Sequence, residues 1–290
     1  MASDSLHDRI TDQFSYRGER ANIWRGFDFL LDTESFLNMG YSPWYMPHVL
    51  GSSQRRLITK IATELKPHLL DSEETQLLDV GCGRGGPTIE LAEELNVPAL
   101  GVDLVPFNIK AARTNAATRG SGGRFLVGDA TRLPIATNTV DICTAIDSLV
   151  YVPDKPAAFE ELARGLKPGG VLAVSDLLTG DSIGTAEADA VRDFAGAWDM
   201  PPLSTVEQYL TDLEHAGFTV ESVQDITANS VGRFQTWTSL YLFLETHIEG
   251  IVERLLAQWG MDRRTVSEQI RHAHRALPHL RHLLVTTTRQ

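Results

Sequence analysis

Cysteine is scarce in this sequence: only Cys82 and Cys143 occur among its 290 residues. Two thiols cannot build a disulfide framework, so we expect a chain that folds in a reducing compartment and is cytoplasmic. The first residues have neither the basic start nor the apolar run of a signal peptide. No uncharged apolar run reaches the roughly 18 residues that a membrane-spanning helix needs, so we expect no membrane span.

Positive charge is also in short supply. Lys and Arg number 26 against 38 Asp and Glu, which gives a formal net charge of −12. Because nucleic-acid binding needs a basic face, this balance argues against a nucleic-acid partner. The apolar fraction of 42% is ordinary for a folded chain, and the length fits one large domain or two small ones.

Short β-branched runs alternate with helical stretches in the middle of the chain. We expect strands near residues 75–80, 98–103, 124–127, 140–146 and 171–176, with helices between them. Strands and helices that alternate at this spacing predict an α/β fold with a doubly wound, mainly parallel sheet. In such a sheet the ligand lies at the carboxyl ends of the strands, where the strand order reverses.

A glycine-rich loop follows the first expected strand. Gly81, Gly83 and Gly86 fit the pattern G-x-G-x-x-G, and Gly85 adds a fourth glycine within six residues. Glycine permits a tight turn and lets a ligand approach the backbone N–H groups closely. Pro87 suits the first turn of the helix that follows. The loop predicts a nucleoside-binding site.

Three acidic residues surround this loop and narrow down the ligand. Asp103 ends the second strand, where a carboxylate can accept hydrogen bonds from ribose hydroxyls. Asp79 precedes the first glycine, and a carboxylate there would repel a pyrophosphate but attract an ammonium group. Asp129 ends the third strand, where it suits an adenine amino group. Together they favour a cationic nucleoside over a dinucleotide.

The residues from Leu77 to Gly86 resemble the first motif of class I S-adenosylmethionine-dependent methyltransferases. Asp103 is similar to the ribose-binding acid of that family, Gly128-Asp129-Ala130 to its adenine-edge motif, and Leu166 to Gly170 to its helix-to-strand turn. The resemblance covers about residues 70–226. It extends to small-molecule enzymes of the ubiquinone, menaquinone and antibiotic-sugar type, because Asn38-Met39-Gly40-Tyr41 resembles their N-terminal cap box.

The resemblance implies S-adenosyl-L-methionine as the cofactor and a Rossmann-like mixed sheet of seven strands. It implies strands at 218–226 and 282–288 that form an antiparallel hairpin. We expect an N-terminal helical cap (1–70), a cofactor-binding core (71–231), a helical insertion that covers the substrate (232–279) and a final core strand (280–290). The cofactor-binding residues expected are Tyr41, Asp79, Gly81, Cys82, Gly83, Gly85, Asp103, Leu104, Gly128, Asp129, Ala130, Ile146 and Asp147.

Candidate catalytic residues follow from the same resemblance. The antibiotic-sugar enzymes often have Ser-Leu-His-His after the fourth strand, whereas this chain has Ser148-Leu149-Val150-Tyr151. The polar groups left nearby are Asp147, Tyr151 and Asp176. A general base helps a hydroxyl acceptor, but positioning alone can accelerate methyl transfer. Asp147 could instead bind the ammonium of the cofactor or simply end its strand.

Two further residue groups have competing interpretations. His272, His274, His279 and His282 lack the spacing of a helical metal site, so we expect no metal and a solvated helix end. Several aromatic residues could line an apolar acceptor pocket or pack in the core, and Trp44 and Trp198 are the best pocket candidates. The full set is Trp24, Trp44, Tyr45, Trp198, Trp237 and Tyr241.

The sequence as a whole predicts a methyltransferase that acts on a small, partly apolar acceptor such as a natural product, quinone, sugar or lipid. Oxygen is the first choice of acceptor atom and carbon the second. The alternatives are a nicotinamide-dependent dehydrogenase, which shares the G-x-G-x-x-G pattern, and a non-catalytic nucleoside-binding relative. The chain could form a homo-oligomer, and the sequence leaves this open.

Overall fold

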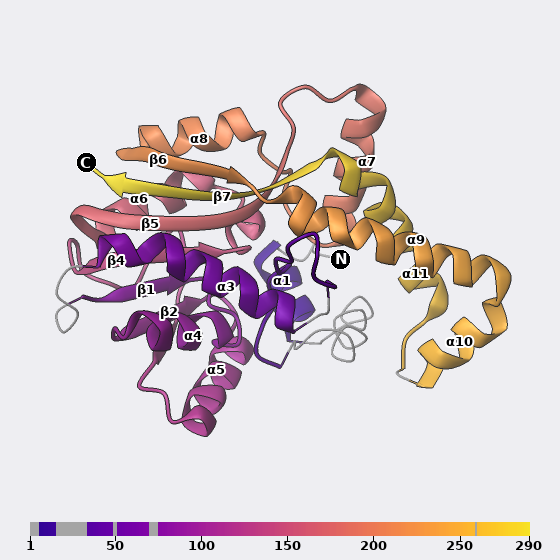
Figure 1. Cartoon of the computed structure of the whole chain (residues 1–290), viewed down its shortest axis with the longest axis horizontal. Helices are drawn as coiled ribbons and strands as arrows, with labels where there is room; N and C mark the ends of the chain where they lie inside the picture. Colours follow the sequence, from indigo (N-terminus) through magenta and orange to yellow (C-terminus); the bar gives the residue numbers. More distant parts are fainter. Residues whose placement is uncertain (1–5, 16–33, 49–50, 70–74, 259) are drawn as a thin grey trace.

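The computed structural model describes residues 6–15, 34–48, 51–69, 75–258 and 260–290. Its centre is a seven-stranded sheet in the order β3-β2-β1-β4-β5-β7-β6 (Figure 1). The strands from β1 to β5 pair in parallel, and β7 pairs antiparallel with both β5 and β6. The strand bounds are Leu77–Val80 (β1), Ala99–Asp103 (β2), Arg124–Val127 (β3), Val140–Ile146 (β4), Leu166–Thr179 (β5), Phe218–Asp225 (β6) and Leu280–Arg289 (β7).

Helices cover both faces of the sheet. Side chains of α3 and α4 form one core with Leu77, Ile142 and Leu284, and side chains of α6 and α8 form another with Leu78 and Val174. The alternation of side chains along a strand explains why neighbours such as Leu77 and Leu78 belong to different cores. The helix bounds are Leu6–Phe14 (α1), Ser52–Leu65 (α3), Gly86–Leu95 (α4), Pro106–Arg119 (α5), Lys155–Gly165 (α6), Thr185–Ala197 (α7), Val206–His215 (α8), Val231–His247 (α9), Glu249–Gln258 (α10) and Arg263–Ala276 (α11).

The predicted fold class is confirmed, with the final antiparallel hairpin and the helices α9, α10 and α11 between β6 and β7. One boundary differs. The sequence predicts a break at Pro168-Gly169-Gly170 before the fifth strand, but β5 runs from Leu166 to Thr179 and includes it. The pairing with β4 shifts register there, and Gly169 adopts a φ of +77°. The turn is therefore absorbed into the strand as an irregularity.

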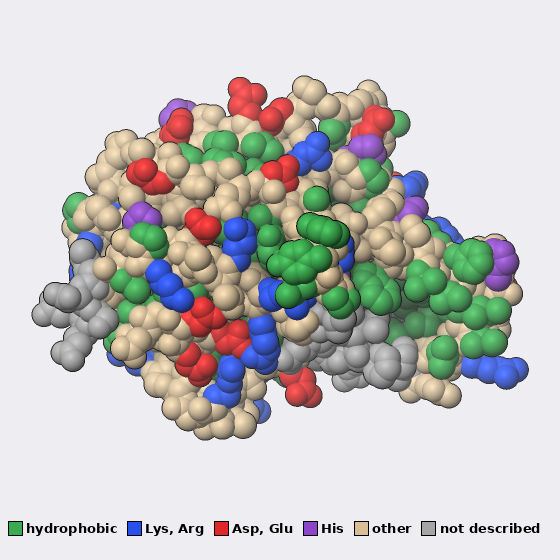
Figure 2. All heavy atoms as spheres, in the orientation of Figure 1, with side chains coloured by type: hydrophobic (Ala, Val, Ile, Leu, Met, Phe, Trp, Pro, Cys, Tyr) green, Lys and Arg blue, Asp and Glu red, His purple; other side chains and the backbone are tan. Residues whose placement is uncertain are grey.

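Helices α9 and α10 extend away from the sheet as an arm (Figure 1). Figure 2 shows hydrophobic side chains gathered over this arm, and exposed residues there include Trp237, Leu240 and Phe243. None of the helices in the described part of the chain combines the length and the apolarity that a membrane crossing requires. The described portion of the predicted cap contains α1 and α3, while Trp24 lies outside the described residues.

Candidate functional site

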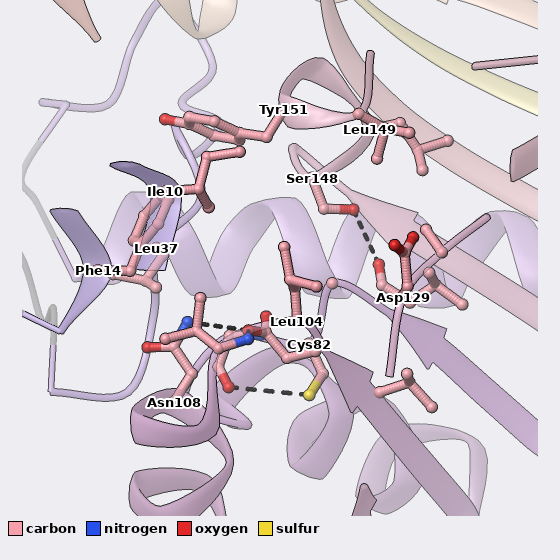
Figure 3. A pocket seen from close by; sticks show the side chains of 18 of the residues that line it. Ile10, Phe14, Leu37, Cys82, Leu104, Asn108, Asp129, Ser148, Leu149 and Tyr151 are labelled. Carbon is pink, nitrogen blue, oxygen red and sulfur yellow. Dashed lines mark hydrogen bonds between the residues drawn. The ribbon is translucent and has the colours of Figure 1, made fainter. Parts of the chain in front are cut away.

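A cavity of about 270 Å³ opens at the carboxyl ends of β1, β2 and β4 (Figure 3). This is the edge where the strand order reverses between β1 and β4, as a doubly wound sheet predicts. The loop after β3 contributes Gly128, Asp129 and Ala130, and α1 closes the opposite side with Ile10 and Phe14. The cavity is large enough for part of a small molecule and brings together segments that are far apart in the sequence.

The glycine loop forms the floor of this cavity. Gly81 and Gly83 both line it and have φ values of +73° and +52°, which L-residues rarely adopt. A Cβ on Gly81 would overlap the Cβ of Ser148. Gly85 serves packing instead, because a Cβ there would lie 2.9 Å from Ala112, and its absence lets α4 pack close to α5. The first two glycines shape the cavity, and Gly85 lies outside its lining.

The Asp103 carboxylate lines the cavity and is held by three hydrogen bonds. Its Oδ2 accepts a hydrogen bond of 2.9 Å from the Gly83 N–H, and its Oδ1 accepts from the Val105 N–H at 2.9 Å and from Asn108 Nδ2 at 3.1 Å. Burial raises the pKa of Asp103, and these hydrogen bonds act in the opposite direction. The three donors fix the carboxylate, which has acceptor capacity left for a hydroxyl group.

Asp129 lines the cavity two strands away from the glycine loop. Its Oδ1 accepts from both the backbone N–H and the hydroxyl of Thr131, each at 2.8 Å. Its Oδ2 lies 3.6 Å from His7 Nε2 on α1. Further along this helix, Arg9 Nε donates to Asp199 Oδ1 at 3.2 Å. Two polar contacts therefore hold α1 across the cavity.

Asp147 directly follows the last residue of β4, lines the cavity and has a φ of +52°. Its Oδ1 accepts from Ser175 Oγ at 2.6 Å and contacts His282 Nε2 at 2.8 Å, and its Oδ2 accepts from the Met39 N–H at 2.7 Å. Burial acts to raise the pKa of Asp147, but the His282 charge and these hydrogen bonds outweigh it, so the pKa lies below its ordinary value. The carboxylate is therefore ionised at neutral pH and is a weak base.

Tyr151 lies beside Asp147 at the same end of the cavity. Its ring packs edge-on against Phe14 of α1, with 5.1 Å between the ring centroids. Burial raises the pKa of Tyr151 above its ordinary value, and the nearby carboxylates of Asp199, Asp147 and Asp176 raise it more. The phenol therefore stays protonated and is suited to donating a hydrogen bond rather than to acting as a base.

The structure does not bring Asp176 to the cavity lining. Ser175 points toward Asp147, and because side chains alternate along β5, Asp176 faces away, toward α8. There its Oδ2 accepts from the Tyr209 hydroxyl at 3.2 Å, and its Oδ1 accepts from the Val150 N–H at 3.0 Å. Asp176 therefore stabilises the Leu149–Tyr151 turn on the side that faces away from the cavity.

Burial raises the pKa of Asp176 to about 7, which leads to a stability prediction. In the folded protein Asp176 stays protonated at pH values at which the unfolded carboxyl is already ionised. The stabilisation that Asp176 gives the folded state is therefore complete below about pH 4, and it is lost as the pH rises to about 7. Relative to Asp176→Asn, the wild-type free energy of unfolding should fall by a few kcal/mol over this range, at about 1.4 kcal/mol per pH unit. Urea unfolding of both proteins across this range measures the difference, and parallel curves would contradict the prediction.

Two other predicted cofactor residues also lie off the cavity lining. Both oxygens of Asp79 accept hydrogen bonds from threonine hydroxyls, of Thr88 at 2.5 Å and of Thr144 at 2.9 Å. Burial raises the pKa of Asp79 to about 6. Tyr41 packs beside α3, where the Lys60 ammonium lies 5.6 Å from its ring centroid. Asp79 therefore ties α4 to β4, and Tyr41 faces a helix.

The remaining predicted cofactor residues do line the cavity: Cys82, Leu104, Gly128, Ala130 and Ile146. Reasoning from sequence missed His7, Ile10 and Phe14, although Ile10 and Phe14 have the spacing of one helix face. It also named Trp44 among the best candidates for an acceptor pocket, whereas this side chain is 82% exposed. Trp198 packs beside Phe194 in the cluster that contains Tyr151.

His282 is the most consequential residue that sequence reasoning misjudged. His282 lies on β7, within the strand expected at 282–288, but the expected solvated environment is wrong for it, because its side chain is completely buried. It contacts Asp147 across 135 positions of sequence, so no local signal could have paired them. No group of three or more His, Cys, Asp or Glu side chains in the described ranges is arranged to hold a metal ion.

Comparison with known proteins agrees with this geometry. Residues 78–174 match the family model described as a methyltransferase domain. The chain is 32% identical to 27-O-demethylrifamycin SV methyltransferase of Amycolatopsis mediterranei (strain S699), over 71% of this chain and 76% of that protein. It is 30% identical to the O-methyltransferase resE of Aspergillus sclerotiorum, over 67% of this chain and 72% of that protein.

A solved structure has the same fold at low identity. It is the geranyl diphosphate C-methyltransferase from Streptomyces coelicolor A3(2) in complex with Mg²⁺, geranyl diphosphate and S-adenosyl-L-homocysteine. The TM-score is 0.70 at 15% identity, over 99% of each chain. This chain belongs to the class I S-adenosylmethionine-dependent methyltransferases. It is an enzyme of that family, which displaces the dehydrogenase and non-catalytic alternatives, and its cofactor is S-adenosyl-L-methionine.

Proposed function

We propose that this enzyme methylates an oxygen atom of a small, partly apolar acceptor. The observation that carries the proposal is the make-up of the cavity side formed by α1, where Ile10 and Phe14 face the glycine loop with Tyr151 beside them. Apolar side chains at this place favour a ring or hydrocarbon over a highly charged molecule. Two relatives named for O-methylation support oxygen over carbon.

We assign the parts of the cofactor to successive groups of cavity residues. We assign the ribose to Asp103, the adenine end to Gly128, Asp129 and Ala130, and the close backbone approach to Gly81, Cys82 and Gly83. Gly81 and Gly83 line the cavity without side chains, which leaves their backbone open to the close approach of a ligand. We assign the methionine end to Leu104, Ile146 and Asp147. The bound cofactor supplies a methyl group activated by the sulfonium charge.

The acceptor end has two polar groups with different roles. Asp147 is ionised and already accepts three hydrogen bonds, from Met39, Ser175 and His282. It therefore fixes these neighbours, and its negative charge favours a positively charged group of the cofactor. Tyr151 stays protonated and can donate to an acceptor oxygen.

Asp176 is turned away and Asp147 is a weak base, so we infer an acceptor hydroxyl that is acidic enough to lose its proton to water and react as the oxyanion. Its oxygen forms the bond to the methyl carbon as the methyl–sulfur bond breaks, which leaves a neutral thioether. Positioning then supplies most of the acceleration, and well-oriented reactants can gain about 7–11 kcal/mol. Ile10 and Phe14 of helix α1 pack beside Tyr151, and these apolar side chains favour exclusion of water from this end.

The test is transfer of a labelled methyl group. Purified enzyme is incubated with cell extract and carbon-13 methyl-labelled cofactor, and mass spectrometry identifies products heavier by one labelled methyl. The carbon-13 chemical shift then separates a methoxy group from a C-methyl or N-methyl group. We expect a methoxy product whose yield is lower with Asp103→Ala at the same subsaturating cofactor concentration. A product labelled only on carbon or nitrogen would overturn the oxygen assignment.

A further inference from the structure

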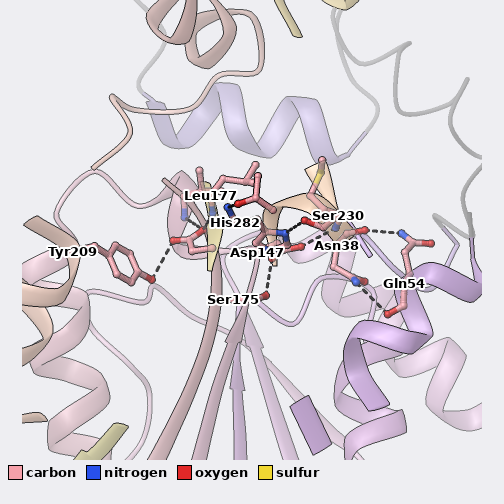
Figure 4. A network of polar contacts seen from close by, with 12 residues as sticks. Asn38, Gln54, Asp147, Ser175, Leu177, Tyr209, Ser230 and His282 are labelled. Atoms are coloured by element: carbon pink, nitrogen blue, oxygen red, sulfur yellow. Dashed lines mark hydrogen bonds and ion pairs between the residues drawn. The ribbon is translucent and has the colours of Figure 1, made fainter. Parts of the chain in front are cut away.

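A buried polar chain runs behind the acceptor end of the cavity (Figure 4). His282 Nε2 contacts Asp147 Oδ1 at 2.8 Å, and His282 Nδ1 contacts Ser230 Oγ at 2.5 Å. The side chains of His282 and Ser230 are completely buried, and neither residue lines the cavity. His282 and Ser230 therefore connect the start of β7 and the residue before α9 to the end of β4, and both lie outside the cavity lining.

Asp147 connects this chain to the segments that do line the cavity. Its Oδ2 accepts a hydrogen bond from the backbone N–H of Met39, which is next to the cavity-lining residue Asn38. Its own backbone begins the turn that carries Ser148 and Tyr151 into the lining. A φ of +52° is costly for aspartate, so the surrounding contacts must hold it. The His282 contact is one of three to the Asp147 carboxylate that do so, beside the 2.7 Å hydrogen bond from the Asp147 N–H to the Ser175 carbonyl.

We propose that His282 is a positioning residue for methyl transfer: it fixes the Asp147 carboxylate, and through it the Met39 segment and the turn that carries Tyr151. The proposal rests on the proposed function, which assigns this end of the cavity to the methyl group and the acceptor. His282 acts through Asp147 alone, because its other ring nitrogen is held by Ser230 inside the protein. Fixed orientation of this kind matters because a misplacement of about 1 Å can cost roughly 10²-fold in rate.

Three variants separate positioning from simple stabilisation. His282→Ala removes the contact to Asp147, whereas His282→Gln keeps an N–H donor at a similar reach. Leu284→Ala is the matched control: Leu284 lies two residues further along β7, is completely buried, packs in the core with α3 and α4, and does not itself line the cavity. All proteins are compared at a temperature at which circular dichroism shows them fully folded.

The first readout needs no acceptor. Hydrogen exchange followed by mass spectrometry reports the peptides that contain Met39 and the turn at 147–151. We expect faster exchange of both peptides in His282→Ala, near wild-type exchange in His282→Gln, and no selective change in Leu284→Ala. Equal exchange in His282→Ala and Leu284→Ala would overturn the proposal.

The second readout separates kcat from binding. With the acceptor found by labelled-methyl transfer, we expect kcat to fall about 10- to 100-fold in His282→Ala, in line with the cost of misplacement, and to recover largely in His282→Gln. The dissociation constant of S-adenosyl-L-homocysteine, measured by calorimetry, should change much less than kcat. A kcat equal to that of Leu284→Ala would overturn the positioning role. A wild-type enzyme that yields no methylated product would contradict the proposed function, while the exchange result still tests His282.

Discussion

Asp103→Ala is expected to weaken cofactor binding roughly 5- to 150-fold, equivalent to about 1–3 kcal/mol, the cost of leaving polar partners unpaired. The variant loses the carboxylate that we assign to the ribose. It also leaves the Gly83 N–H, the Val105 N–H and Asn108 Nδ2 without their acceptor in a buried place. Because the Gly83 contact holds the glycine loop, both the direct contact and the shape of the cradle are lost.

The measurement is calorimetric titration with S-adenosyl-L-homocysteine. Asp141→Ala is the matched control, since the Asp141 carboxylate also accepts a backbone N–H, from Gln76 at 2.9 Å, and pairs with Lys167 at 2.8 Å. Asp141 lies on β4 outside the cavity lining, so its loss should cost stability without changing cofactor affinity. Unchanged affinity in a folded Asp103→Ala protein would show that the ribose assignment is wrong.

Gly81→Ala should reduce cofactor binding and activity more severely, to below detection. The new Cβ would overlap the Cβ of Ser148 and lie 2.6 Å from its Oγ, which no small adjustment of the packing can relieve. The φ of +73° adds about 1–2 kcal/mol for an L-residue. The loop or the turn at Ser148 must move, and both line the cavity.

Two further variants separate the clash with Ser148 from the backbone strain at Gly81. Gly169→Ala places an L-residue at a φ of +77° with no atom within 4 Å of the new Cβ, so it isolates the backbone strain. The double variant Gly81→Ala with Ser148→Gly removes the two clashing atoms, and the next neighbour would be the Ser148 Cα at 3.6 Å. We expect the double variant to regain cofactor binding in part. Loss of binding that the second change does not relieve would contradict the steric explanation.

Local sequence patterns were enough to predict the five parallel strands, whereas the final hairpin was implied by the family resemblance. Strands β1 and β3 end at loops that carry a recognisable signal, Gly81-Cys82-Gly83 after the first and Gly128-Asp129 after the second. Because parallel strands present their carboxyl ends at one edge, these signals also located the cavity. The positions of Asp103 and Asp129 in its lining follow from that rule.

Side-chain direction within this framework required the tertiary structure. Asp176 and Asp79 were placed at the right edge of the sheet but on the wrong side, because the register of the strand decides which face a side chain takes. The part played by α1 was equally hidden, since its contacts to Asp129 and Asp199 join residues more than a hundred positions apart.

The sequence by itself therefore predicted the parallel part of the sheet from periodicity, and its motifs of a few adjacent residues carried the family resemblance that implied the final hairpin and the cofactor. Only the tertiary structure decided what surrounds the acceptor end. His282 reaches Asp147 because the antiparallel strand β7 pairs beside β5 and brings its first residues to the edge where β4 ends. Such a contact depends on strand order and register, which are set by packing of the whole sheet rather than by any local pattern.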